Sequence, residues 1–172
     1  SELIKEGLID IDKIRINYAG HDFCFIKEQA DYYNLSSIVI DHGFLTRNES
    51  LALQHSSDIL ILSTWNSNKE TGVFPGKFLE YMGMRKPIIA LVDGNLPNSE
   101  VCSVMREGNL GVCFEEANRS QDFSTLKSYL YNQYQCFITG NGLVFEPDQI
   151  VLNRYEYRNI AEKYMELIDE KD

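Results

Sequence analysis

The sequence lacks the patterns that mark metal centres and disulfide scaffolds. Its 4 cysteines include no Cys-x-x-Cys pair, and its 3 histidines do not have the spacing of metal ligands. We therefore expect no bound metal. The cysteines are scattered among apolar neighbours, at Cys24, Cys102, Cys113 and Cys136. That scatter is typical of reduced core residues and indicates a cytoplasmic protein.

Long apolar runs and an excess of positive charge are also missing. No run approaches the length of a membrane span, and no charged-then-apolar signal opens the chain, so we expect no integral membrane segment. The 16 lysines and arginines are outnumbered by 26 aspartates and glutamates, which gives a net charge of −10. This balance argues against nucleic acid and against adsorption on anionic lipid. A phosphate-binding site would have to be a local exception to this negative charge, built from helix amides and a lysine.

What the sequence does contain is a regular alternation of apolar strands and amphipathic helices. Its length of 172 residues predicts one domain, 1–172. Strands are predicted at residues 13–19, 37–41, 59–63, 88–92 and 110–114. Helices are predicted at residues 22–34, 46–56, 77–85, 99–106, 122–136 and 151–170, and Thr46 with Glu49 forms a capping box. The alternation predicts an α/β fold with a parallel sheet covered by helices.

The stretch from residue 59 to residue 92 organises the chain. A buried strand leads into a polar loop that contains Gly72, Pro75 and Gly76, and a helix and a second buried strand follow. This order is a βαβ unit whose loop sits at the carboxyl end of a strand. Open α/β sheets bind their ligands at that position.

The start of the helix at residue 77 has the chemistry of an anion site. Pro75 and Gly76 let the chain pass close to a ligand, and the first helical amides have no partner within the helix. Together with Lys77 and the positive end of the helix dipole, these amides favour a phosphate. Glu80, one turn further on, can accept hydrogen bonds from two neighbouring hydroxyls of a ribose. The alternative is an ordinary loop in which Lys77 and Glu80 are solvated surface residues.

Four segments in order resemble the donor-binding half of the group 1 family of retaining glycosyltransferases, which have the GT-B fold. GVFPGKFLEYMGMRKPIIA resembles the family's Gly-rich loop and the helix that carries its glutamate. HSSDILILS is similar to the preceding strand, IVIDHGFLTRNESLALQHSSD to the unit upstream, and GNLGVCFE to a short motif downstream. The resemblance runs from about Ile14 to Glu115.

The resemblance implies a Rossmann-like parallel sheet with helices on both faces, in a fragment of a longer two-domain enzyme. It implies transfer of a sugar from a UDP- or GDP-linked donor to an acceptor hydroxyl, with retention at the anomeric carbon. It also implies that no cofactor or metal ion is needed, and that Lys77 and Glu80 are the catalytic residues. The substrate-binding set would be Gly43 and Phe44 at the nucleobase, Gly76, Lys77, Phe78 and Leu79 at the phosphates, and Glu80 at the ribose.

The sequence departs from the family pattern in two places. Family members often carry a glutamate eight positions before the ribose-binding one, and here Gly72 stands there, with Glu70 two residues earlier. KIRINYAG aligns with the family's second strand, so the first strand and the basic pair that grips the diphosphate would precede Ser1. Either the alignment is off by one unit, or the sheet is rebuilt from the amino-terminal stretch or a partner chain. Lacking these parts, the fragment alone should bind a donor weakly and catalyse nothing.

Several residues have both a functional and a structural interpretation. His42, at a strand end, could donate to a ligand or form a local hydrogen bond. Gly43 and Phe44 could face a nucleobase, or end a strand and staple the next helix. Trp65 could stack on a base or sugar, or anchor its loop. For Asn98 to Glu100, a helix cap is favoured over contact with a donor.

Two functions of other classes stay open. A sugar-nucleotide epimerase would need an acid/base set that the sequence does not show. A non-catalytic α/β binding module would be a protein whose loop no longer binds a ligand.

The partners implied by the resemblance are a nucleotide sugar and a glycan or lipid-linked acceptor, bound through the missing amino-terminal half. The location would be the cytoplasm, at the inner face of the membrane if that half attaches there. The last helix, with Tyr155, Tyr157 and Tyr164, is expected to pack on the domain.

Overall fold

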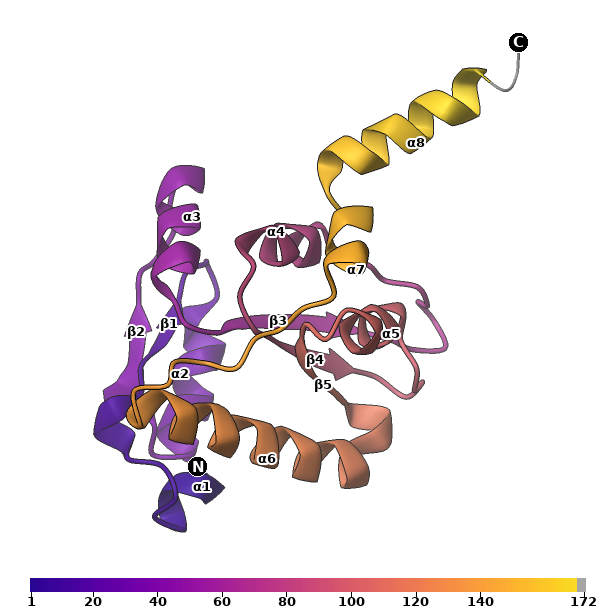
Figure 1. The fold of residues 1–172 in the computed structure, drawn as a ribbon. Coiled ribbons are helices and arrows are strands. Elements are labelled where there is room, and N and C mark those ends of the chain that lie inside the picture. Colours follow the sequence, from indigo (N-terminus) through magenta and orange to yellow (C-terminus); the bar gives the residue numbers. More distant parts are fainter. Residues whose placement is uncertain (170–172) are drawn as a thin grey trace. The chain divides into compact units, whose positions relative to one another are not determined.

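The computed structural model describes residues 1–169 and shows an α/β protein in which every strand pair is parallel (Figure 1). The predicted parallel α/β architecture is therefore confirmed. Contacts divide the chain into two compact units, where length alone led us to expect one domain. We call them unit 1, Ser1–Ser57, and unit 2, Asp58–Asp172. The strands form two separate ladders, one in each unit, in place of the single expected sheet.

Unit 1 contains a two-stranded ladder in which a helix follows each strand. Its elements are α1 (Glu2–Lys5), η1 (Ile11–Lys13), β1 (Ile16–Tyr18), α2 (Phe23–Tyr32), η2 (Ser36–Ile38), β2 (Val39–Asp41) and α3 (Arg47–Ser56). Strand β1 is the first strand of the described residues, and its Ile16 lies beside Val39 of β2. The buried apolar residues of this unit are Leu3, Ile9, Ala30 and Ile38.

Helix α3 begins at the predicted capping box, which is confirmed. The Thr46 hydroxyl accepts a hydrogen bond from the amide of Glu49, and the Glu49 carboxylate accepts one of 2.8 Å from the amide of Thr46. The hydroxyl and the amide of Thr46, in that order of effect, hold the pKa of Glu49 below its ordinary value.

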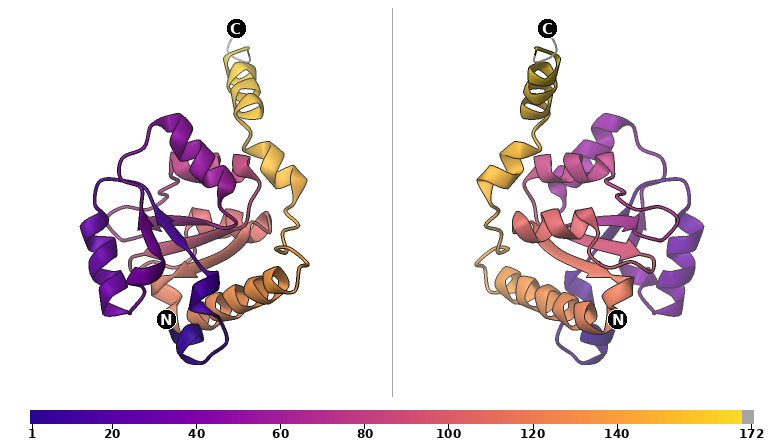
Figure 2. Two further views of the ribbon diagram at one scale, coloured as in Figure 1. Left: turned by 90° about the vertical axis from the view of Figure 1, so that its left-hand side faces the viewer. Right: turned by 90° about the vertical axis from the view of Figure 1, so that its right-hand side faces the viewer.

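Unit 2 contains a three-stranded ladder in the order β3-β4-β5. Its elements are β3 (Leu60–Trp65), α4 (Gly76–Met84), β4 (Ile88–Asp93), α5 (Glu100–Glu107), β5 (Gly111–Glu115), η3 (Glu116–Asn118), α6 (Arg119–Ile138), α7 (Gln149–Arg154) and α8 (Tyr157–Asp169). In both views of Figure 2, α4 and α6 lie on opposite sides of the three strands. Helices therefore flank both faces of this sheet.

The main core lies where the sheet packs on α4, α5 and α7. Short apolar strands and the buried faces of these helices supply its side chains. The members are Leu62, Phe78, Met82, Ile88, Ala90, Val101, Val104, Met105, Leu110, Val151 and Leu152. Because Phe78 and Met82 are one turn apart, they anchor α4 beside the carboxyl end of β3 and fix where its first turn sits.

The last helix differs from the prediction. One helix was expected over residues 151–170, but Tyr155 and Glu156 separate α7 from α8. Tyr155 packs on the core as expected. Tyr157 and Tyr164 are 69% and 66% exposed, so their expected packing on the domain is wrong. Glu170, where the predicted helix ended, lies outside the described residues.

The interpretation of the cysteines as reduced core residues is also wrong. Cys102 in α5 and Cys113 in β5 form a disulfide, with their Cα atoms 5.5 Å apart. Both elements pack side by side, which brings the two side chains together although they are 11 residues apart in sequence. Cys24 is exposed, and Cys136 is partly buried.

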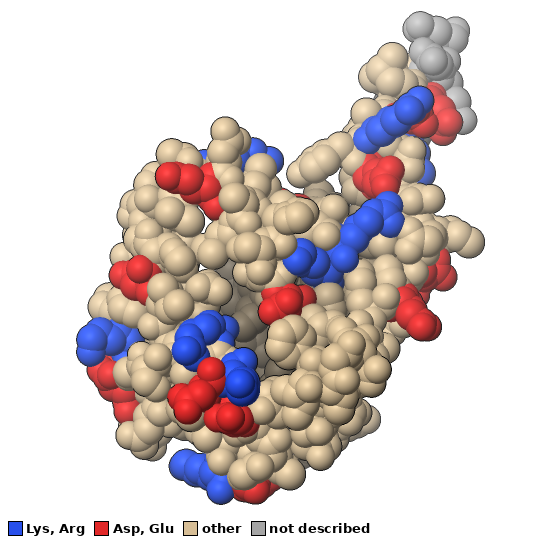
Figure 3. All heavy atoms as spheres, turned by 60° about the vertical axis from the view of Figure 1, so that its left-hand side comes forward, with Lys and Arg blue, Asp and Glu red and all other residues tan. Residues whose placement is uncertain are grey.

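The distribution of surface charge and the length of the helices can be compared with the partners expected from the sequence. On the face shown in Figure 3, basic side chains lie beside acidic ones and do not gather into one large patch. Among residues 1–169, no helix combines the length and the apolar character that crossing a membrane requires.

Candidate functional site

The site predicted at the start of α4 is built from the loop after β3 and the first turn of the helix. The loop, residues 66–75, leaves the carboxyl end of β3. Pro75 is the N-cap residue, in an extended conformation, and its side chain provides no cap. The first turn contains no acidic residue. The positive end of the helix dipole is therefore left without a negative side chain in its first turn.

The amides available at this helix start differ from the expected set. The amide of Phe78 donates to the carbonyl oxygen of Pro75 at 2.9 Å. Leu79 comes after the positions that lack intrahelical partners, so its amide bonds within the helix. Within the described chain, Gly76 and Lys77 are the residues whose amides can meet an anion here. Phe78 contributes a fully buried side chain instead, packed on Phe74 with ring centroids 5.2 Å apart.

Lys77 and Glu80, the two side chains predicted for phosphate and ribose, contact each other. The Lys77 Nζ atom lies 2.7 Å from a carboxylate oxygen of Glu80, across one turn of α4. The lysine side chain is 46% exposed and the glutamate side chain 15%. Lys77 Nζ also lies 5.8 Å from the ring centroid of Tyr81. Burial raises the pKa of the Tyr81 phenol, and the Glu80 carboxylate adds to that effect.

A pocket of about 270 Å³ borders Glu80. It is lined by residues of α4 and by the junction of α7 with α8, among them Glu80, Gly83, Arg85, Tyr155 and Tyr157. Arg85 ends α4 in the left-handed conformation, with φ of 52°, and forms an ion pair of 3.0 Å with Glu156. Glu80 therefore lies between the first turn of α4 and a cavity with aromatic and charged walls.

The loop before α4 is held by Trp65 and Glu70. The indole N–H of Trp65 donates to the Glu70 carboxylate, and the amide of Glu70 donates to the Ser67 carbonyl at 3.1 Å. The hydrogen bond to Glu70 supports the interpretation of Trp65 as a loop anchor, although 48% of the residue is exposed. Gly72, which stands where the family has its first glutamate, has φ of 69°. A glutamate there would be strained.

A buried polar cluster at the ends of β4 and β5 was missed from the sequence. Glu115 is fully buried, and its carboxylate accepts hydrogen bonds from the amides of Ser99 at 2.7 Å and Asn98 at 2.9 Å. Ser99 caps α5 by accepting from the amide of Cys102, so the predicted helix cap is confirmed. The cluster fixes the loop after β4 at the carboxyl end of the strands, which is the end from which the loop before α4 also leaves. No local signal marks Glu115, because a glutamate that ends a strand usually lies on the surface.

The residues predicted for the nucleobase belong to unit 1. Gly43 has φ of 62°, and its amide donates to the Asp41 carboxylate at 2.8 Å. Phe44 is 74% exposed and stacks on His21, with ring centroids 4.5 Å apart. His42 lies 2.9 Å from the side-chain oxygen of Asn17, which confirms the local hydrogen bond.

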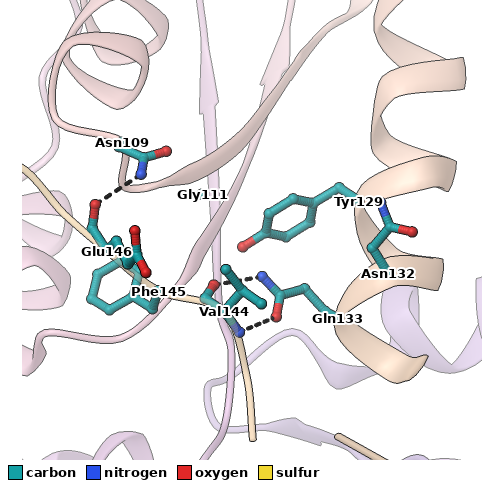
Figure 4. Close-up of a pocket in the computed structure, with 8 residues that line it drawn as sticks. All are labelled: Asn109, Gly111, Tyr129, Asn132, Gln133, Val144, Phe145 and Glu146. Carbon is teal, nitrogen blue, oxygen red and sulfur yellow. Dashed lines mark hydrogen bonds between the residues drawn. The ribbon is translucent and has the colours of Figure 1, made fainter. Parts of the chain in front are cut away.

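A second pocket, of about 290 Å³, lies at the amino end of β5 (Figure 4). This end of the parallel sheet is opposite the end from which the loop before α4 leaves. Gln133 bonds the backbone of Val144 twice, at 2.8 and 2.9 Å, and so fastens the segment after α6. Burial raises the pKa of the Tyr129 phenol, and the side chain of Gln133 works against that shift. No group of three or more potential metal ligands occurs in the described part of the chain.

No family model and no curated protein matches the chain. The site geometry and the sequence resemblance therefore carry the functional conclusion.

Proposed function

We propose that the chain is the donor-binding part of a glycosyltransferase, which holds a nucleotide-diphosphate sugar at the start of α4. The observation that carries the proposal is the contact of Lys77, on the first turn of a helix without a side-chain cap, with Glu80 one turn further on. That helix starts after the loop at the carboxyl end of β3, where open α/β sheets bind ligands. The resemblance described above assigns the lysine to phosphate and the glutamate to ribose.

In this proposal the diphosphate takes its hydrogen bonds from the amides of Gly76 and Lys77 and from the lysine ammonium. Hydrogen bonds to a charged phosphate are stronger than those between neutral groups. The carboxylate of Glu80 accepts from the ribose hydroxyls. During transfer, negative charge grows on the departing diphosphate, so the same donors stabilise the leaving group. Lys77 is then the main catalytic side chain of this half.

Binding also has to change the contact between the two side chains. Without a ligand, Lys77 satisfies the carboxylate of Glu80 at 2.7 Å. When the diphosphate takes the ammonium, the ribose hydroxyls replace it at Glu80. A single ligand that carries a diphosphate and ribose hydroxyls at the correct spacing is therefore needed to give both Lys77 and Glu80 a new partner. A free phosphate replaces only one of them, and we expect it to bind more weakly than a nucleoside diphosphate.

The test is a calorimetric titration of the chain with UDP, GDP and ADP. We expect one nucleotide to bind and Lys77→Ala to weaken it about tenfold or more, because a charge-assisted hydrogen bond is lost. Lys163→Ala removes the same charge from α8 and is the matched control, with unchanged affinity expected. Equal binding by wild type and Lys77→Ala would contradict the proposal, as would the absence of binding by a longer protein that contains this chain.

The role of Glu80 has its own test. Glu80→Ala should weaken the nucleotide that binds, but not its 2′,3′-dideoxy analogue, which offers no hydroxyls to the carboxylate. Glu166→Ala, on α8, is the control for the change of charge. An equal loss of affinity for both nucleotides would show that Glu80 supports the helix and does not contact ribose.

The remaining parts of the proposal follow from the same resemblance. The acceptor is a glycan or a lipid-linked hydroxyl, bound by a second half that this chain does not contain. Transfer would retain the anomeric configuration and would take place in the cytoplasm or at the inner face of a membrane. The isolated chain should bind a donor without transferring sugar. A non-catalytic module would instead keep its partner in the Glu80→Ala variant and bind no nucleotide.

A further inference from the structure

The pocket at the amino end of β5 is built entirely from residues of unit 2 (Figure 4). Its volume of about 290 Å³ is at the lower end of the range of small-molecule pockets. The Gln133 side chain bonds the backbone of Val144 at 2.8 and 2.9 Å, and the Asn109 side chain donates to the carbonyl oxygen of Glu146 at 2.8 Å. These bonds hold two walls of the pocket together before any ligand arrives, which lowers the ordering cost of binding.

The pocket has a negative side chain and no positive one. Among the described residues that line it, Glu146 alone is charged, and none is a lysine, an arginine or a histidine. The Glu146 carboxylate forms no hydrogen bond or ion pair with any residue in the described range 1–169. Burial raises the pKa of the Tyr129 phenol, so this group is neutral near pH 7. The lining therefore attracts a cation and repels an anion, as does the net charge of −10.

The other walls suit a cation that carries an organic body. Tyr129 reaches from α6 toward the segment that contains Val144, Phe145 and Glu146 (Figure 4). Aromatic rings attract ammonium groups as well as apolar surface. Asn109 uses its side-chain nitrogen for the bond to Glu146, so its side-chain oxygen can accept a hydrogen bond. An aromatic wall with a carboxylate and an amide oxygen fits a ligand with N–H donors at one end and carbon at the other.

We propose that this pocket binds a primary ammonium ion that carries a short apolar body, of the arylalkylamine class. The ammonium group donates to the Glu146 carboxylate and to the side-chain oxygen of Asn109, and the body packs on Val144 and Phe145. The pocket and the start of α4 lie at opposite ends of the parallel sheet. The inference is therefore independent of the proposed nucleotide site.

The test is an NMR titration of the isotope-labelled chain with phenethylamine, which is protonated at neutral pH. We expect saturable shifts of the side-chain amide signals of Asn109 and Gln133. The dissociation constant should be on the order of 1 mM, as expected for a ligand of this size. Phenethyl alcohol has the same shape without the charge and is the matched control ligand. Because Glu146 is exposed and water screens its charge, we expect the alcohol to bind about fivefold more weakly.

Two variants show whether Glu146 is the group that recognises the charge. Glu146→Gln keeps the size of the side chain and the backbone carbonyl that Asn109 binds. It should weaken the amine about fivefold and leave the alcohol unchanged. Glu166→Gln, on α8, removes the same charge elsewhere in unit 2 and should leave both affinities unchanged. The comparison of amine with alcohol needs no variant, so it decides the question even if Glu146→Gln does not fold.

Three results would overturn the proposal. Absence of saturable shifts up to the solubility limit of the amine would show that the pocket binds no such ligand. Equal binding of the amine and the alcohol would show an apolar pocket that does not recognise charge. An equal loss of amine affinity in Glu146→Gln and Glu166→Gln would show a general attraction of cations to a negative protein.

Discussion

The buried carboxylate of Glu115 accepts a hydrogen bond of 2.7 Å from the backbone amide of Ser99. Through this contact, the last residue of β5 holds the residue that caps α5. The other carboxylate oxygen accepts from Asn98 at 2.9 Å and from the side chain of Asn118 at 3.2 Å. A fully buried carboxylate is tolerated here because donors surround it.

Replacing Glu115 with glutamine should destabilise unit 2. The amide group of glutamine places a donor against the donors of Ser99 or Asn98, so a buried hydrogen bond is lost and two N–H groups oppose each other. We expect the free energy of unfolding to fall by about 2 kcal/mol, measured by urea denaturation with Trp65 fluorescence. Glu116→Gln, at the next and more exposed position, removes the same charge and should cost less than about 0.5 kcal/mol. Equal losses in the two variants would refute the role of burial.

Removing the hydroxyl of the capping box should destabilise α3 and raise the pKa of Glu49 towards its ordinary value. Thr46→Ala deletes the hydroxyl that caps the helix, and we expect a loss of about 1 kcal/mol. Thr46→Ser keeps the hydroxyl and should be close to wild type. The measurements are urea denaturation and an NMR titration of the Glu49 carboxyl.

The pH dependence of this cap follows from the direction of the shift. The pKa of Glu49 is lower in the folded protein than its ordinary value, because the ionised carboxylate accepts the bonds from Thr46. Its contribution is therefore present above the unfolded pKa and is lost as the pH falls through the folded pKa. Thr46→Ala should reduce this acid-side loss, because it deletes the hydroxyl and keeps the backbone amide. An unchanged pKa of Glu49 in that variant would contradict the assignment.

Reduction of the Cys102–Cys113 disulfide should lower stability without opening the sheet. The bond closes a short loop, since the two residues are 11 apart in sequence, and the chain-entropy model gives about 3 kcal/mol for a loop of this size. In denaturant without reductant, titration should find two thiols, Cys24 and Cys136. After reduction it should find all 4. Cys24→Ser should leave the free energy of unfolding unchanged, and 4 thiols before reduction would refute the disulfide.

Two glycine substitutions should have opposite effects. Gly111 has φ of 136°, and an added Cβ would lie 2.1 Å from the carbonyl oxygen of Ile88. Gly111→Ala should therefore cost more than about 3 kcal/mol, because both the conformation and the strand contact are disturbed. Gly83, inside α4, has open space around it, and Gly83→Ala should stabilise by up to about 1 kcal/mol. Thermal unfolding of both variants measures the difference, and equal melting temperatures would contradict the reason given.

Local patterns in the sequence predicted the elements well. The start of α3 was predicted from Thr46 and that of α5 from Asn98 or Ser99, because a cap is a contact between residues three positions apart. The βαβ unit around α4 was predicted from its glycines, prolines and apolar runs. The meeting of Lys77 with Glu80 also follows from their spacing, since side chains three apart share one face of a helix.

The candidate site was predicted less completely. Which amides remain available depends on how the helix starts, and the bond from Phe78 to Pro75 takes one of them. The break between α7 and α8 was missed because the apolar periodicity continues through Tyr155, whose ring instead stacks on Phe74. The nucleotide role of Lys77 and Glu80 stays a prediction.

The sequence by itself determined where most helices and strands lie, because caps, turns and periodicity act over a few neighbouring residues. Only the tertiary structure decided that the strands form two ladders and that Cys102 meets Cys113. It also decided that Glu115 is buried against Ser99, 16 residues away. These contacts depend on how whole elements pack, and that packing joins residues that no local pattern relates.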